Sequence, residues 1–277
     1  MRLRVIYVLI SVALFFAYCK KKKSTPEEDP TATTTGSSTT TTGGPTPPAP
    51  GTQIVKIYDQ DLSSSGYHDN ATFFYFYDSQ YRLSSIKEYD TTLTPAYVPT
   101  VKKYKETFYT YNSANLVTTE VTTQYAPSTS VQTNTYYYDS QNRMYKMTVY
   151  FDGNFNDSVR YTYLPNKIVR TYGVNGNTLD SIYLNPADQN LDSVKYVSYG
   201  YTYKYLNDGK PNPFKDRDYA LSPYGVNAYR CDHNTRKIHS PFGTFNFTYT
   251  YNANNYPAFY TTILGSGSGC NVTFYYN

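Results

Sequence analysis

The chain has 277 residues, including 36 tyrosines, 14 phenylalanines and no tryptophan, and its formal net charge is +4. Most of this charge lies in the leading segment, because residues 52–277 hold about 19 basic and 18 acidic groups. A nearly neutral domain lacks the clustered Lys and Arg of a nucleic-acid-binding face, so the composition excludes a nucleic-acid partner.

Residues 1–18 predict an export signal. Two arginines precede an apolar run from Val5 to Ala17 that is too short for a permanent membrane helix. The run stops at Cys19, and the whole segment resembles a bacterial lipoprotein signal, which is cut before a cysteine whose thiol carries diacylglycerol. Tyr18 departs from the usual Gly, Ala or Ser, so an ordinary secretory signal or an uncleaved anchor is the alternative. We predict lipidation at Cys19 and a lipid-anchored location at the outer membrane or cell surface, facing the periplasm or the outside.

Residues 19–51 predict a disordered tether. Four lysines follow Cys19, and the remainder is rich in Thr, Ser, Gly and Pro with almost no apolar residue. Such a stretch buries too little surface to offset its ordering entropy. The lysines are read as a solvated spacer, with a headgroup-binding patch as the alternative. Residues 45–50 favour extended polyproline II, which stiffens the end of the tether.

Residues 52–277 predict a single all-β domain. Short runs of Tyr, Phe, Thr and Val alternate with clusters of Asn, Asp, Gly and Pro, as in successive antiparallel strands. In residues 245–251 aromatic and polar residues alternate, so one sheet face is apolar and the other is wet. The expected fold is an antiparallel meander that forms a curved sheet or an open, barrel-like structure.

A tyrosine-rich hairpin signature recurs, most clearly in residues 75–83 and 136–144. Asp78 and Asp139 suit the turn because their side chains bond the following backbone amides. Weaker copies begin at residues 109 and 161, and the first of these reads as one residue shorter. The copies are spaced at roughly two strands per unit, which favours a meander with variable loops.

The abundance of tyrosine predicts an unusual core. Each ring buries a large area while its hydroxyl needs water or a partner. We expect the rings to pack at mid-height with their hydroxyls at a wet rim, and we expect few aliphatic side chains in the core.

Residues 70–277 resemble a family of bacterial lipoprotein domains of unknown function that have a porin-like fold and Tyr-Asp hairpin repeats. Besides the hairpins, the resemblance rests on the short motifs at residues 203–205, 212–214, 249–252, 256–257 and 272–276. It implies a β-rich, barrel-like sheet and no established activity.

A membrane-spanning pore is not the prediction, in spite of that fold. Spanning strands need about 9 to 11 residues and a continuous lipid-facing apolar band. The runs here are nearer seven residues, and their non-aromatic faces carry Thr, Asn and Ser.

The inventory for catalysis or metal binding is thin. Cys231, His233 and His239 lack the spacing of a zinc site. Outside the cytoplasm, Cys231 and Cys270 could instead form a disulfide, which the sequence leaves open. No metal site, cofactor or catalytic residue is predicted.

Two acidic segments are interpreted as turns and not as ligand-binding or catalytic sites. Asp59-Gln60-Asp61 places two carboxylates on one strand face, which could serve glycoside hydrolysis or calcium binding, but plain turn chemistry is preferred. For Asn207-Asp208-Gly209, a hairpin turn is preferred over a calcium-binding role.

Ser158, Ser181 and Ser193 share the pattern Asp-Ser-aliphatic. This pattern resembles the acceptor for O-glycosylation in some Gram-negative secreted proteins. The preferred alternative is a turn that opens into a strand.

Two functional classes remain. The first is a non-enzymatic binding or assembly module for a glycan or an envelope protein, with the rings of Tyr136, Tyr137 and Tyr138 as the candidate contact surface. The alternative is a polymer-processing hydrolase that uses dispersed carboxylates, which a pocket gathering two perturbed acids would favour.

Overall fold

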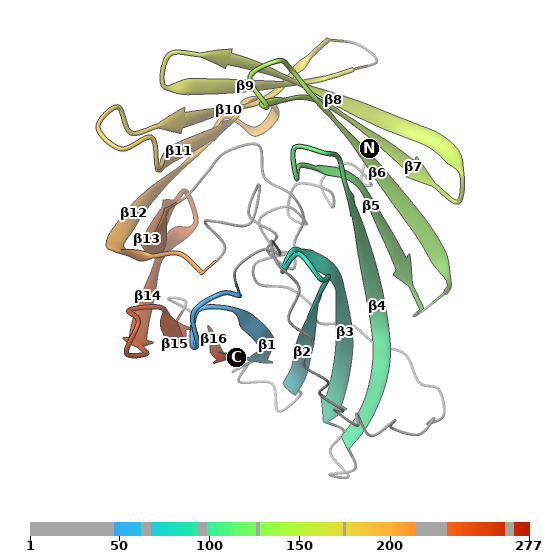
Figure 1. The fold of residues 1–277 in the computed structure, drawn as a ribbon. Helices are drawn as coiled ribbons and strands as arrows, with labels where there is room; N and C mark the ends of the chain where they lie inside the picture. Colours follow the sequence, from blue (N-terminus) through green and yellow to red (C-terminus); the bar gives the residue numbers. More distant parts are fainter. Residues whose placement is uncertain are drawn as a thin grey trace.

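The chain folds into a closed barrel of sixteen antiparallel strands (Figure 1). The computed structural model describes residues 47–61, 68–93, 99–125, 128–173, 176–213, 232–263 and 269–277. Each strand pairs with its sequence neighbours, and β1 pairs with β16. The predicted all-β meander is confirmed, and the sheet closes completely. The strands are β1 Ile54–Asp61, β2 His68–Tyr77, β3 Leu83–Leu93, β4 Pro99–Tyr111, β5 Val117–Gln124, β6 Ser130–Tyr138, β7 Met144–Phe151, β8 Asn154–Leu164, β9 Lys167–Tyr172, β10 Thr178–Leu184, β11 Leu191–Tyr196, β12 Tyr201–Pro211, β13 His233–Ser240, β14 Gly243–Tyr251, β15 Pro257–Ile263 and β16 Gly269–Tyr276.

The connections divide between two ends of the barrel. The proximal end carries the start of β1, the end of β16 and tight turns such as 78–82, 112–116, 139–143 and 252–256. The distal end carries the alternate connections, including the short helix η1 (Val197–Tyr199) and the turn at residues 241–242. Within the described residues, no helix is long and apolar enough to cross a membrane.

Strand alternation buries one set of side chains inside the barrel and exposes the other set on its outer face. In β14, Phe245, Phe247 and Tyr249 are half-buried, whereas the intervening Asn246 and Thr248 are exposed. The described residues form a single sheet with no second layer around it, so the buried face is the interior. The predicted alternation at residues 245–251 is therefore present, with the aromatic face inward.

The core contains more aliphatic side chains than the composition led us to expect. No strand contributes more than two, and closing sixteen strands brings most of them into one cluster. The aromatic rings of Phe73, Tyr75, Tyr109, Tyr136 and Tyr161 complete the same cluster. The buried aliphatic residues are Ile54, Ile57, Leu83, Ile86, Leu116, Val117, Val159, Ile168, Ile182, Leu191, Val194, Ile238 and Val272.

A ring of buried apolar residues lines the proximal end. One such residue stands at or next to the start of almost every odd-numbered strand. We call this set the proximal apolar ring: Ile54, Leu83, Val117, Met144, Ile168, Leu191 and Pro257.

Six tyrosine hydroxyls bond the main chain beside this ring. Each tyrosine lies at or near the end of an even-numbered strand and donates to a carbonyl oxygen of the odd-numbered strand before it. In β12 the amide of Asn207 takes this role toward Leu191 at 3.5 Å. The hydroxyls therefore reach backbone oxygens instead of the expected wet rim. The six pairs are Tyr77–Ile54, Tyr111–Leu83, Tyr138–Val117, Tyr163–Met144, Tyr249–Thr235 and Tyr276–Pro257.

Four proximal turns share one hydrogen-bond pattern. The Oδ1 atom of Asp78 accepts from the backbone amides of Gln80 and Arg82, and Asn112, Asp139 and Asn252 make the same pair of bonds. The residue three positions after each of these has a φ of about 60°, the left-handed geometry that follows a type I turn. This explains why the turn residues recur as Asp or Asn.

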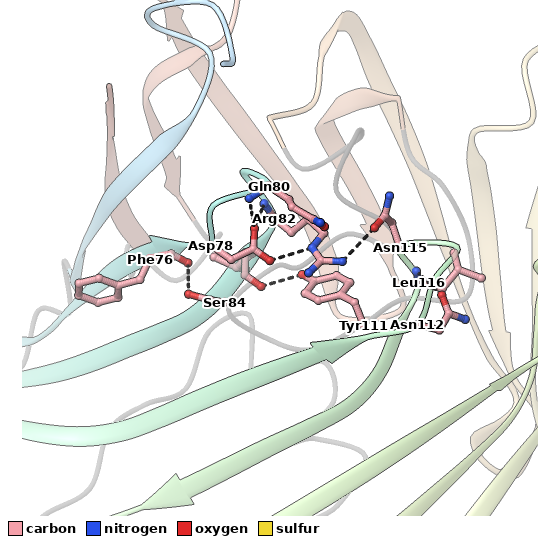
Figure 2. A network of polar contacts seen from close by, with 10 residues as sticks. Phe76, Asp78, Gln80, Arg82, Ser84, Tyr111, Asn112, Asn115 and Leu116 are labelled. Atoms are coloured by element: carbon pink, nitrogen blue, oxygen red, sulfur yellow. Dashed lines mark hydrogen bonds and ion pairs between the residues drawn. The ribbon is translucent and has the colours of Figure 1, made fainter. Parts of the chain in front are cut away.

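The turn at Asn112 corrects one detail of the sequence reading. It has the same length as the turn at Asp78, because Leu116 occupies the position of Arg82. Figure 2 shows Arg82 lying between the two turns, donating to Asp78 through Nε at 2.8 Å and to Asn115 through Nη1 at 2.9 Å. Neighbouring hairpins are thereby joined at the proximal end.

Candidate functional site

The barrel interior holds three buried acidic side chains, each with a partner. Glu120 accepts a hydrogen bond from the Tyr136 hydroxyl at 2.7 Å. Burial raises the pKa of Glu120, although Tyr136 and Lys105 act in the opposite direction. Glu88 pairs with Lys105 at 3.2 Å on the neighbouring strand.

The third interior acid is Asp180, which is completely buried. The guanidinium of Arg170 binds both of its carboxylate oxygens, with Nε 2.7 Å from Oδ1. Tyr196 lies close to this ion pair, and burial raises its pKa to about 12. A bidentate pair of this kind fixes the register of β9 against β10, where Arg170 and Asp180 are directly opposite.

The outer face of β16, β1, β2, β3 and β4 carries alternating aromatic and basic side chains. In register across these strands stand Tyr275, Lys56, Phe74, Lys87 and Glu106. The Lys56 ammonium lies 4.9 Å from the ring centre of Tyr275 and 5.6 Å from that of Phe74. We call this surface, with the neighbouring Phe76, Tyr89, Lys103 and Phe108, the aromatic–lysine face.

A second exposed aromatic group lies at the distal end. The ring of Tyr201 stacks on Tyr199 at 6.2 Å and meets Phe242 edge to face at 5.2 Å. Phe242 is 64% exposed, the highest value among the large apolar side chains described. These three rings, here called the distal aromatic cluster, come from η1, the start of β12 and the turn after β13.

The three rings predicted as a contact surface do not face the same way. Tyr136 is 4% exposed and points into the barrel, and Tyr138 is half-buried with its hydroxyl on the Val117 carbonyl. Tyr137 lies on the outer face, where Lys146 sits 5.2 Å from its ring centre and Tyr145 packs beside it. Only Tyr137 is therefore placed to meet a partner.

The three Asp-Ser-aliphatic segments lie inside strands. Ser158, Ser181 and Ser193 fall in β8, β10 and β11, and each is less than 9% exposed. The preferred interpretation of the sequence was a turn that opens into a strand, but none of the three segments begins a strand in this way. The folded barrel covers all three hydroxyls, so an O-linked glycan would need these strands to part.

The other predicted residues are dispersed. Asp59 and Asp61 both belong to β1. Asn207, Asp208 and Gly209 form an irregular stretch within β12 instead of a hairpin turn, and Asp208 accepts a bond from the Tyr251 hydroxyl. His233 and His239 stand at opposite ends of β13, next to Asn190 and Thr244 respectively. Among the described residues, no three His, Cys, Asp or Glu side chains gather as a metal site.

Several predictions fall outside the described residues. These are the signal at residues 1–18, the lipidated Cys19, the tether up to residue 46, and Cys231 of the possible pair with Cys270.

Sequence reasoning missed both exposed aromatic groups. Phe74 and Phe76 lie on β2 and Phe108 lies on β4, and Phe108 joins the other two rings only through the register of β2 with β3 and of β3 with β4. The distal aromatic cluster likewise joins residues 199, 201 and 242. The one available signal was the run of aromatic residues on both faces of β2, which exceeds what a single buried face requires.

The barrel is similar to a solved bacterial structure. That structure is a porin-like protein from Bacteroides uniformis ATCC 8492, with a TM-score of 0.57 and 16% sequence identity. The alignment covers 82% of this chain and 97% of the other chain. No family model and no curated protein matches the sequence. The likeness establishes a porin-like barrel fold.

Proposed function

We propose that this protein is a lipid-anchored barrel of the bacterial envelope that stands in water beside the outer membrane and acts as a non-enzymatic binding module. The lipid on Cys19 and the tether would hold the barrel, and the distal aromatic cluster would meet a glycan or protein partner. The observation that carries the proposal is the polar outer face of the barrel.

A lipid-facing barrel needs a continuous apolar band about 25 Å tall on its outside. Seven strands, including β4 with 13 residues, have nine or more residues, exceed the predicted runs of about seven, and would reach far enough. Their outward side chains nevertheless include Thr110, Arg160 and Lys204, and β14 presents only Thr and Asn between its aromatic residues. The composition of the outer face therefore favours water over hydrocarbon as its surroundings.

The first test is release from the membrane. A specific protease site is placed in the Thr/Ser/Gly stretch at residues 36–41, and isolated outer membranes carrying the full chain are digested. We expect the barrel to appear intact in the aqueous fraction, and a Cys19→Ala variant to be there without digestion. A barrel that stays in the membrane after complete cleavage would overturn the non-spanning proposal.

Binding is proposed for the distal aromatic cluster because its rings are exposed and already packed against one another. Aromatic rings offer a large contact area at low entropic cost, and they suit the apolar faces of sugar rings. The cluster lies at the opposite end of the barrel from residue 47, where the tether joins. A partner could therefore reach it without obstruction by the anchor.

This binding is tested with a panel of glycans and polysaccharides and the protease-released barrel, with products followed by mass spectrometry. We expect binding without cleavage, weakened by a Tyr201→Ala, Phe242→Ala double variant. A matched Tyr145→Ala variant removes an exposed ring of the outer face away from the cluster. Cleavage products would overturn the non-enzymatic reading, and equal binding by the two variants would exclude the cluster.

The arrangement of the interior acids supports a structural role over a hydrolytic one. Glu120 is bound by Tyr136, Glu88 by Lys105 and Asp180 by Arg170. These pairs join neighbouring strands of the wall, where directional bonds define register.

A further inference from the structure

We infer that the aromatic–lysine face is a docking surface for anionic lipid headgroups, which holds the barrel on its side against the membrane. This inference rests on the proposed lipid anchor. The exposed rings would enter the headgroup region of the bilayer, and the lysines would meet the phosphates.

The face combines the two side-chain types that membrane interfaces favour. Phe74, Phe76, Phe108 and Tyr275 are 36 to 49% exposed although they are large and aromatic. Phe76 and Phe108 stand on either side of Ser85 in register, and the serine is only 6% exposed. The rings thus cover Ser85 between β2 and β4, and exposed Phe side chains next to Lys are typical of surfaces that lie in the membrane–water interface.

The lysines lie among the rings instead of at their edge. Lys56 sits between Tyr275 and Phe74, and Lys87 lies 5.0 Å from the ring centre of Phe76. The apolar stems of such lysines can follow the rings while the ammonium groups reach the phosphate level.

The charge of the face is positive within a domain that is nearly neutral. Lys56, Lys87 and Lys103 outnumber its acidic residue, Glu106, which bridges Lys87 at 3.6 Å and also binds Lys103. Basic side chains next to an anionic leaflet gain from its surface potential, and this gain falls with salt.

The position of the tether identifies a lipid surface as the occupant. The tether enters β1, one of the five strands of the face, and Lys56 is the third residue of that strand. The entry point is fixed, because Asn252 donates to the Gly51 carbonyl and Asn254 to the Pro50 carbonyl, each at 2.9 Å. A chain anchored before this point keeps the face close to the bilayer at high effective concentration, so even weak contacts are populated. A soluble polyanionic glycan would use the same charges but would gain nothing from this placement.

The inference is tested by lysine acetylation read out residue by residue with mass spectrometry. The lipidated full chain is incorporated into vesicles of phosphatidylcholine with one-fifth phosphatidylglycerol and compared with the same protein in detergent. Lys167 is the matched control, because it faces outward on β9 and lies 5.2 Å from the Tyr183 ring much as Lys56 lies by Tyr275.

We expect Lys56 and Lys87 to react at least three-fold more slowly on vesicles, with Lys167 unchanged and the protection lost in high salt. Equal reactivity of Lys56 and Lys167 in protein that still floats with vesicles would overturn the docking face and leave the anchor intact. Protection of all three lysines would contradict the proposed function itself, because it would indicate a buried outer face. Protection by soluble polygalacturonate but not by vesicles would assign the face to a glycan.

A variant separates docking from lysine chemistry. Replacing Phe76 and Phe108 with alanine removes two exposed rings and should restore Lys87 reactivity on vesicles while flotation persists. The corresponding change at Tyr145 and Phe155, which are exposed elsewhere on the barrel, should leave Lys87 protected. Persistent protection in the first variant would exclude the rings from docking.

Discussion

The hydroxyl of Tyr138, the last residue of β6, donates a hydrogen bond at 2.7 Å to the carbonyl oxygen of Val117, the first residue of β5. Val117 is completely buried, so its carbonyl has no access to bulk water. The same contact recurs in five other hairpins of the described barrel. The repeated tyrosine therefore supplies a hydrogen-bond donor to a backbone carbonyl of the preceding strand at the proximal end.

Removing one of these hydroxyls should weaken the fold. We expect Tyr138→Phe and Tyr111→Phe each to lower the free energy of unfolding by about 1 kcal/mol, because a buried carbonyl loses its donor. Equilibrium unfolding in urea measures the change. Tyr145→Phe is the control, since this ring is exposed, and it should have no effect. Equal stability of all three variants would mean that the hydroxyls contribute nothing to closure.

The turn carboxylates should tolerate asparagine but not alanine. Asp78→Asn keeps the acceptor for the amides of Gln80 and Arg82, as Asn112 does naturally, whereas Asp78→Ala removes it. We expect the alanine variant to lose about 1 kcal/mol of stability at pH 7 and the asparagine variant to lose less. The two variants are compared by thermal unfolding. An equal loss in the two variants would instead assign the role to the Arg82 ion pair, which both of them remove.

The pH dependence of Asp78 follows from its pKa. Burial acts to raise this pKa, but the amide and guanidinium bonds of Arg82 outweigh it and lower the value. A carboxyl with a lowered pKa stabilises the fold above its ordinary value of 3.8, and the stabilisation is lost as the pH falls through the native value. Asp78→Ala should therefore differ from the parent at pH 7 and approach it near pH 2.

Glu120 and Glu106 should respond to pH in opposite directions. Burial raises the pKa of Glu120, so its ionisation on folding is unfavourable, and stability falls as the pH rises through the native value. Burial also acts to raise the pKa of Glu106, but Lys103, Tyr125 and Lys87 lower it overall. Glu120→Gln should thus stabilise the barrel at pH 7, and Glu106→Gln should destabilise it.

The comparison of the two glutamine variants is made by unfolding midpoints at pH 4 and pH 7. Both side chains are 7% exposed, but Glu120 faces the barrel interior beside Tyr136 and Glu106 lies on the outer face beside Lys87, so the two variants contrast these surroundings. A loss of stability at pH 7 in Glu120→Gln would show that the hydrogen bond from Tyr136 outweighs the cost of burying the charge.

Removing one partner of the Arg170–Asp180 pair should lower the free energy of unfolding much more than replacing both partners with apolar residues. Asp180→Asn leaves a guanidinium without its counter-charge, for which we expect a loss of about 3 to 5 kcal/mol. An Arg170→Met, Asp180→Leu double variant removes both charges and should recover most of that loss. Urea unfolding of the two variants and the parent measures both effects. A double variant as unstable as the single one would indicate that the pair also specifies the register of β9 and β10.

The hairpins could be predicted from the sequence because their determinants are local. Asp78 and Asp139 act on amides two and four residues ahead, and the alternation around Tyr249 lies within one strand. Asn207-Asp208-Gly209 looks like a turn by the same local rule, but pairing with β13 holds it within β12 as an irregular stretch.

Closure and the exposed faces could not be predicted because they depend on distant pairs. The proximal apolar ring takes one residue from each of seven strands, so no segment of the sequence contains its pattern. The inward Tyr136 and the outward Tyr137 are adjacent in sequence, and only the closed sheet decides which of them meets solvent. Lys56 and Tyr275 meet although they lie at opposite ends of the chain.

The hydrogen bond between Gln53 and Asn277 joins the two ends of the barrel sequence, so it forms late in folding. Gln53 donates its backbone amide to the Asn277 side chain at 3.2 Å, across 224 residues of sequence. During synthesis one edge of β1 therefore has no partner until β16 has been made, and an open strand edge is a template for aggregation. Loop-closure entropy makes such a distant pairing slow. Loss of the last hairpin would leave two open edges, so we expect a chain truncated there to aggregate.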